Sequence, residues 1–144
     1  MKRKIPKFIA WHLRPGVENE AMDSHDPIDV EFQGPKGTTK GAVLFSTKTN
    51  AERFIKDNHL TDCATGELDL GALAKRLTLQ RDEQRVTHVI ADYRHVGMMA
   101  DASEISGVLA AIEKAGNDAE DVQAEFLNVV LWATPKRGWW GFAN

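Results

Sequence analysis

The sequence contains one cysteine, Cys63, and no apolar run that reaches the roughly 18 residues needed to span a bilayer. A single cysteine excludes an intramolecular disulfide and a zinc site built from several cysteines, and it fits a reducing compartment. The five histidines are scattered, and no two have the spacing that places paired metal ligands on one helical face. We therefore expect a cytoplasmic chain that does not enter a membrane and holds no metal and no cofactor.

Positive charge is also scarce. The chain has 18 Lys and Arg residues against 21 Asp and Glu residues, a formal net charge of −3. Five basic residues lie in residues 1–16, whereas residues 101–125 carry seven acidic residues and one lysine. Nucleic-acid binding needs a basic face that displaces counterions, so the sequence predicts no nucleic-acid partner. The short apolar run after the basic start lacks the length and the cleavage site of a secretory signal.

The composition that remains is that of an ordinary globular protein. The 144 residues are 42% hydrophobic and 27% charged, and a chain of this size can bury a core without disulfides or metals. We predict one domain over residues 1–144, with an aromatic tail over residues 134–144. No internal repeat or low-complexity segment divides the chain.

Five segments have the pattern of β-strands. Residues 41–45 (GAVLF) form a continuous apolar run, as expected for a strand covered on both sides. Residues 28–32 alternate apolar and acidic side chains, which is typical of a half-exposed strand. The other predicted strands are residues 7–13, which stop at a turn signal, residues 85–93, and residues 127–133, which stop before a proline.

Helices are predicted between these strands because polar capping residues precede apolar stripes of helical spacing. The predicted helix-start residues are Thr49 with Glu52 as a capping box, Asp69, and either Ser103 or Asp101 for a helix that Gly116 ends. Residues 57–67 are predicted as a loop and residues 117–126 as a short acidic helix. The alternation predicts a single α+β or α/β domain, with a mixed β-sheet of about four to five strands flanked by three to four helices.

One part of this pattern resembles a known family. The stretch GAVLFSTKTNAERFIKDNHL, followed by the leucine-striped LGALAKRL and the strand VTHVIADY, is similar to the amino-terminal domain of the SseB family. The resemblance covers Gly41 to Tyr93, and after Val89 the sequence lacks the Asn-Pro-Gly-like turn of that family. It implies a small mixed-sheet domain of bacterial proteins, some linked to type III secretion and many without an assigned activity. It implies no catalytic residue.

A possible anion site lies where the strand over residues 41–45 meets the next helix. Ser46, Thr47 and Lys48 stand at this junction, where free backbone amides and the helix dipole can hold an anion or another ligand. The turn has no glycine that would let the backbone wrap a phosphate, and the sequence is far from a P-loop. The alternative is that these hydroxyl groups only cap the helix.

The second candidate site is the loop from Asp92 to Asp101, just beyond the carboxyl end of a predicted central strand, where open α/β sheets bind ligands. His95 is a candidate general base oriented by Asp92 or Asp101, and Arg94 could hold an anion. In the alternative interpretation the loop only bonds its own backbone, and its methionines, Met98 and Met99, fill the core. Asp62 raises the pKa of Cys63 and so disfavours a nucleophilic cysteine.

The third candidate is the aromatic tail, in which Arg137, Trp139, Trp140 and Phe142 could anchor a protein partner, because aromatics and Arg dominate binding hot spots. They could equally pack over the sheet and close the fold. We expect a non-enzymatic bacterial protein-interaction or adaptor domain, related to secretion or to another pathway, that binds a protein partner or a second copy of itself. The alternative is a small enzyme or an anion-binding or ligand-binding domain that uses the Asp92 to Asp101 loop.

Overall fold

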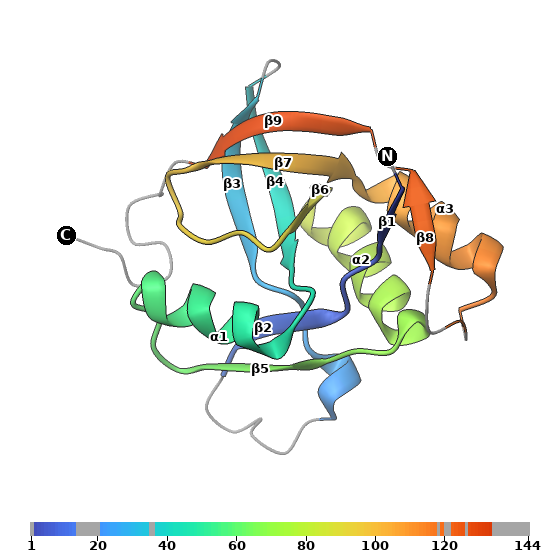
Figure 1. Cartoon of the computed structure of the whole chain (residues 1–144), viewed down its shortest axis with the longest axis horizontal. Coiled ribbons are helices and arrows are strands. Elements are labelled where there is room, and N and C mark those ends of the chain that lie inside the picture. The colour runs from blue at the N-terminus through green and yellow to red at the C-terminus, as the bar shows by residue number, and fades with distance from the viewer. Residues whose placement is uncertain are drawn as a thin grey trace.

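The computed structural model describes residues 2–13, 21–34, 37–117, 119, 122–125 and 127–133 (Figure 1). Five strands close into a small barrel in the order β3-β4-β6-β7-β9. They are β3 (Asp29–Gly34), β4 (Gly37–Leu44), β6 (Val86–Ala91), β7 (Met99–Glu104) and β9 (Asn128–Ala133). The pair β4–β6 is parallel and the other four pairs are antiparallel. The prediction of a single α+β domain with a mixed sheet is therefore confirmed.

Two short antiparallel ribbons and three α-helices surround the barrel. The ribbons pair β2 (Phe8–His12) with β5 (Cys63–Glu67), and β1 (Lys2–Lys4) with β8 (Gln123–Glu125). The helices are α1 (Lys48–Asp57), α2 (Leu70–Gln84) and α3 (Ile105–Ala115), with a 3-10 turn, η1 (Met22–Ser24). Figure 1 shows α2 and α3 together on one side of the barrel, and α1 apart from them beside β2.

The core has two parts because side chains alternate across the barrel wall. In β4, Val43 joins the apolar side chains that fill the barrel interior, whereas Ala42 and Leu44 join the layer under α2 and α3. Phe32 and Leu131 are fully or almost fully buried in the interior cluster. The helices therefore cover the outer side of β4. They also cover the outer side of β6, where Val86 and Val89 belong to the same apolar layer.

Gly41 allows the barrel to close around its filling. A methyl group at this position would collide with Cδ1 of Ile90 and press on the ring of Phe32. Any larger residue at Gly41 would have to displace a packed side chain, and cores of native density resist such overpacking.

The predicted strands over residues 7–13, 28–32, 41–45, 85–93 and 127–133 correspond to β2, β3, β4, β6 and β9. The helix capped by Asp69 is confirmed, since the Asp69 carboxylate accepts the N–H of Ala72 at 2.7 Å. The helix end at Gly116 is also confirmed, with the left-handed φ of 86° that favours glycine.

Other predictions of secondary structure are wrong. Residues 57–67 are not only loop, because Cys63–Glu67 form β5, and the described part of residues 117–126 contains the strand Gln123–Glu125 instead of a helix. The first helix is capped by Thr47, whose hydroxyl accepts the N–H of Asn50 at 3.1 Å, and not by Thr49. The helix is therefore capped two residues earlier than the Thr49–Glu52 spacing predicts.

The start of the third helix differs too. The strand Met99–Glu104 takes up Asp101 and Ser103, and the helix begins at Ile105 with no side-chain cap. This strand, β7, and the first strand, β1, were absent from the prediction. The predicted aromatic tail, residues 134–144, lies outside the described residues.

Candidate functional site

Asp92 connects the end of β6 to the start of α1. One carboxylate oxygen, Oδ1, accepts the backbone N–H of Ser46 at 2.9 Å and Nδ2 of Asn50 at 3.0 Å. The other oxygen, Oδ2, accepts the hydroxyl of Ser46 at 2.8 Å. The backbone N–H of Asp92 donates to the carbonyl of Leu44 at 2.8 Å, and Asp92 has a left-handed φ of 54°.

The anion that the sequence predicts at this junction is therefore supplied by the protein itself. Ser46 gives both its N–H and its hydroxyl to the Asp92 carboxylate, and the Thr47 hydroxyl caps the helix. Lys48 is exposed at the first position of α1. A negative charge at a helix N-terminus is stabilising because the free amides and the helix dipole both favour it. The N–H and the hydroxyl of Ser46 are therefore already used by the Asp92 carboxylate.

The loop that follows β6 is also bound at the carboxyl end of α1, where Asn58 has a buried side chain. Its Nδ2 donates to the carbonyls of Arg94 at 2.7 Å and Phe54 at 2.8 Å, and its Oδ1 accepts the N–H of Val96 at 2.9 Å. A further bond joins the Tyr93 hydroxyl to the carbonyl of Met98 at 2.8 Å. The loop after β6 is thus fixed along α1 from one end of the helix to the other.

Arg94 and His95 lie at the carboxyl end of α1. The Arg94 guanidinium is 3.3 Å from a carboxylate oxygen of Asp57, and Nε2 of His95 is 3.9 Å from the same oxygen. Asp92 instead bonds Asn50 near the amino end of this helix, seven residues before Asp57, which is a rise of about 10 Å at 1.5 Å per residue. The structure therefore does not bring His95 together with Asp92.

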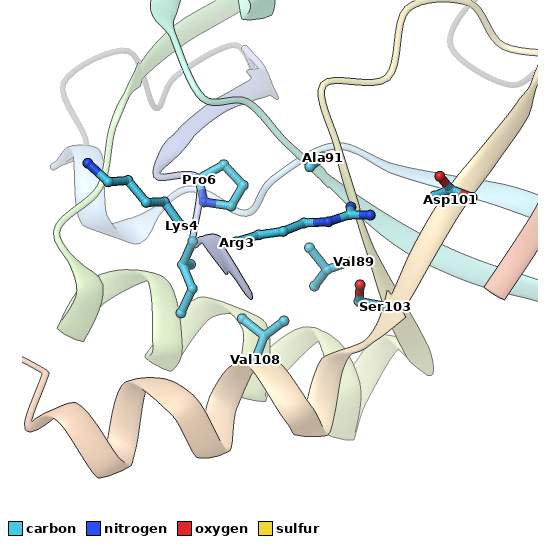
Figure 2. A pocket seen from close by; sticks show the side chains of 9 residues that line it. Arg3, Lys4, Pro6, Val89, Ala91, Asp101, Ser103 and Val108 are labelled. Atoms are coloured by element: carbon cyan, nitrogen blue, oxygen red, sulfur yellow. The ribbon is translucent and has the colours of Figure 1, made fainter. Parts of the chain in front are cut away.

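Asp101 lies in the middle of β7. It lines a cavity of about 220 Å³ together with Asp92, Arg94 and Arg3, and His95 is not among the lining residues. Arg3 and Asp101 also line a smaller cavity of about 20 Å³, which has room for about one water molecule. Figure 2 shows the Arg3 side chain extended across this cavity, with its guanidinium toward the side of Asp101.

No local pattern predicts a role for Arg3 or Asn58, because each is brought to the loop from a distant segment of the chain. The methionines of the loop also differ from the alternative interpretation. Met98 and Met99 do not fill the core, since they are 46% and 56% exposed.

Most of the exposed large hydrophobic side chains of the described residues lie on β7 and β9 or directly beside these strands. In the register of these strands Met99 is opposite Trp132, and Asp101 is opposite Val130. Val130 is 55% exposed and Trp132 is 52% exposed. We call the outward side of these four residues the β7–β9 face. Neither α2 nor α3 covers it, because they pack against β4 and β6.

Cys63 and His12 form a close pair that the sequence did not predict. The two residues are opposite each other in β2 and β5, with Sγ 3.4 Å from Nδ1. Burial, and then the charge of Asp62, raise the pKa of the thiol to about 11, and burial lowers the pKa of His12. Both groups are therefore neutral near pH 7, and the thiolate that a nucleophilic cysteine needs is not formed.

A second polar cluster binds the segment after η1 to α2. The Asp26 carboxylate accepts Nε of Arg76 at 2.8 Å and Nε2 of Gln84 at 3.0 Å. The rings of Trp11 and His25 stack beside it, with centroids 4.7 Å apart. These side chains line a cavity of about 230 Å³, but the carboxylate is already neutralised by the guanidinium. The Asp26 cluster therefore holds the segment after η1 against α2.

The described residues contain no group of three or more His, Cys, Asp or Glu side chains that could hold a metal ion. None of the described helices has the length and apolar character required to cross a membrane. Comparison of the chain with protein-family models, curated proteins and solved structures finds no match.

Proposed function

We propose that the protein is a non-enzymatic, cytoplasmic protein-interaction domain that binds a protein partner through the β7–β9 face. One observation carries this proposal. Six large hydrophobic side chains are exposed in the described part of the chain, and five of them lie on β7 and β9 or directly beside them. They are Met98, Met99, Leu127, Val130 and Trp132. Exposed large apolar side chains that gather on one side of a protein are typical of binding surfaces.

The composition of the face supports a protein partner. Trp and Met are enriched in the buried centres of protein interfaces, and Trp dominates binding hot spots. Full burial of a large apolar side chain contributes about 1.5 to 3 kcal/mol. Polar groups lie next to the apolar ones, with Gln33 of β3 paired with Trp132 and Asp101 paired with Val130. A polar rim around an apolar centre is the usual arrangement of an interface.

The loop from Asp92 to Asp101 favours this function over an enzyme. Catalysis requires the acid, the base and the anion-holding group to converge on one site. Asp92 binds Ser46 at one end of α1, whereas Arg94 and His95 lie beside Asp57 at the other end. Asp92, Arg94 and Asp101 do line one cavity together with Arg3. His95, the candidate general base, does not line it, so the cavity lacks the base that the enzyme hypothesis requires.

The resemblance to the SseB amino-terminal domain is compatible with the same proposal. The matching segment, Gly41 to Tyr93, contains β4, α1, β5, α2 and β6. It forms the parallel strand pair and two of the helices, and it lies apart from the β7–β9 face in the sequence. We therefore propose a bacterial interaction domain, and a role related to secretion rests on that resemblance alone.

The aromatic tail belongs to the same proposal. It follows β9 directly in the sequence, so Arg137, Trp139, Trp140 and Phe142 come within ten residues of Trp132. In this proposal they add contacts to the partner that the β7–β9 face binds. The alternative, in which they close the fold of their own chain, stays open.

Site-specific photo-cross-linking tests the proposed function. A benzophenone side chain replaces Gln33, which is exposed and pairs with Trp132 in the barrel, and the matched control places it at Glu52, which is exposed on α1. Both proteins are produced in the source cells and irradiated. We expect a discrete covalent adduct from position 33 and none from position 52. Equal labelling from both positions, or no adduct from position 33, would contradict the proposal.

A further inference from the structure

We propose that the cavity beside Arg3 and Asp101 binds a small zwitterion, a free α-amino acid with an apolar side chain. The inference does not depend on the partner of the β7–β9 face, because such a ligand binds the isolated chain. The cavity has a volume of about 220 Å³ and lies where the loop after β6 meets β7. Pockets for drug-sized ligands measure about 300 to 1,000 Å³, so this cavity suits a smaller molecule.

Two charged groups of opposite sign mark one end of the cavity. Arg3 and Asp101 line both this cavity and the smaller one of about 20 Å³. The Arg3 side chain extends toward the side of Asp101 (Figure 2). In the part of the chain that the structure describes, no ion pair joins either side chain to the other or to a third residue. A guanidinium and a carboxylate are therefore both available to a ligand that bridges them.

The other two charged side chains of the cavity are already engaged. The carboxylate of Asp92 accepts the N–H and the hydroxyl of Ser46, and Arg94 has an ion pair at the carboxyl end of α1. The lining thus contains two arginines and two aspartates, and neither sign of charge is in excess. This balance favours a ligand with no net charge.

The charges of Arg3 and Asp101 also decide which uncharged ligand fits. A ligand that displaces water from a charged group must replace the hydrogen bonds of that water. A plain anion would leave Asp101 without a donor, and a plain cation would leave Arg3 without an acceptor. A ligand that carries one charge of each sign satisfies both residues.

An α-amino acid has the two groups that this arrangement requires. A guanidinium binds a carboxylate through two parallel N–H groups, and a carboxylate accepts the donors of an ammonium group. In an α-amino acid a single carbon carries both charged groups, as a cavity of this small volume requires. We therefore expect the ligand carboxylate at Arg3 and the ligand ammonium at Asp101.

The remainder of the lining is apolar and indicates the side chain of the ligand. The Tyr93 hydroxyl is already bonded to the carbonyl of Met98 at 2.8 Å. Methionine side chains are flexible and adapt to ligands of different shape. An apolar side chain on the ligand can thus pack against this part of the cavity. Its apolar residues are Ala91, Tyr93, Met98, Met99 and Ala100.

Calorimetric titration of the purified full chain with L-leucine and with L-methionine tests the inference. We expect a dissociation constant of about 0.1 to 1 mM, as for a ligand of fewer than about ten non-hydrogen atoms in an open site. N-acetyl-L-leucine lacks the ammonium charge, and L-leucinamide lacks the carboxylate. Each should bind at least about tenfold more weakly than L-leucine, because it leaves one charged group of the protein unpaired.

Two variants locate the site. Arg3→Gln and Asp101→Asn each remove one charge and should weaken the binding of L-leucine at least about tenfold. Lys2→Gln and Glu104→Gln are the matched controls and should bind like the wild-type chain. These exposed residues lie on the same two strands and are not among the described residues that line the cavity. Circular dichroism checks that each variant is folded, and the two leucine derivatives test the wild-type chain without any substitution.

Three results would overturn the inference. In the first, neither amino acid binds the wild-type chain. In the second, either derivative binds as tightly as L-leucine, so the ligand is not recognised as a zwitterion. In the third, folded Arg3→Gln and Asp101→Asn bind L-leucine like the wild-type chain, which places the ligand elsewhere. The proposed function would stand in each case, because the cross-linking experiment tests it separately.

Discussion

Asp92 binds Ser46 through both of its carboxylate oxygens, with the Ser46 backbone N–H at 2.9 Å and the Ser46 hydroxyl at 2.8 Å. The two residues follow neighbouring parallel strands, in which Leu44 pairs with Ala91. A protein carboxylate thus occupies the place where a helix N-terminus could hold a free anion. Asp92, the first residue of the loop that the sequence predicts as a site, thus connects the end of β6 to the start of α1.

Asp92→Ala should therefore destabilise the protein and also open an anion site. The variant loses two hydrogen bonds to Ser46 and one to Asn50, and we expect a loss of about 2 to 3 kcal/mol in the free energy of unfolding, as for hydrogen bonds to charged groups. Phosphate should then raise the melting temperature of the variant and leave that of the wild-type chain unchanged. Arg94→Ala is the control and should change stability little, since its ion pair is exposed.

The variant and the wild-type chain are compared by thermal melts with and without phosphate at constant ionic strength. Equal stabilisation of both by phosphate would mean that the helix N-terminus is free to bind anions in the wild-type chain.

Asn58→Ala should be more damaging than its small change in volume suggests. The side chain is buried, donates to two carbonyls and accepts the N–H of Val96. Its removal leaves buried polar groups without partners, and each such group costs about 1 to 3 kcal/mol. We expect urea unfolding to show a loss of at least about 2 kcal/mol. A loss no larger than that of the exposed neighbour variant His59→Ala would show that the loop does not depend on Asn58.

Residues 41–45 and Asp92 show what the sequence can and cannot predict. Strong apolar runs such as residues 41–45 predict strands, because burial on both sides leaves a clear pattern. The sequence also predicts that Asp92 follows a central strand, and it does follow β6, which pairs with β4 and β7. The expected open sheet is wrong, because these strands belong to a closed barrel. The partner of Asp92 was not predictable, because Ser46 is 46 positions away and only the parallel pairing of β4 with β6 brings the two together.

The missed strands have a similar physical cause. β7 has the sequence MADASE, which contains no β-branched or aromatic residue. It becomes a strand because its neighbours β6 and β9 offer backbone partners on both sides. The polar strand β1 likewise depends on its pairing with β8. Barrel closure is a property of these long-range pairings, and no local pattern encodes it.

Gly41→Ala and Gly107→Ala should change stability in opposite directions. A methyl group at Gly41 would collide with Ile90 and press on Phe32, and overpacking of this kind costs about 1 to 3 kcal/mol. Gly107 lies in α3 with open space around it, so alanine there should stabilise the helix by about 0.8 to 1 kcal/mol. Urea unfolding measures both. A Gly41 variant as stable as the wild-type chain would contradict the packed barrel interior.

Cys63 should react slowly with iodoacetamide near pH 7. Its thiol has a pKa raised to about 11 by burial and by Asp62, and only the thiolate reacts. The alkylation rate should rise as the pH increases toward 11. In the same range the unfolded chain, with an ordinary thiol pKa of 9.0, releases the proton first. The contribution of Cys63 to stability is thus complete below pH 9 and is lost as the pH rises through 11.

Alkylation is followed by mass spectrometry at a series of pH values, with the unfolded chain in urea as the reference. A rate in the folded chain that matches the unfolded reference at pH 7 to 8 would show that the Cys63 thiol is not protected by its place beside His12.

The central claim is that Trp132 is exposed for binding and does not hold the fold together. The direct test compares Trp132→Ser with Leu131→Ala, its neighbour in β9, by urea unfolding. Leu131 is only 2% exposed, and its variant should lose about 2 to 5 kcal/mol. Trp132→Ser should lose less than about 1 kcal/mol, as surface substitutions do, and should prevent binding of the partner. A loss for Trp132→Ser as large as that for Leu131→Ala would show that the indole belongs to the core, and the β7–β9 face would then not be a binding surface.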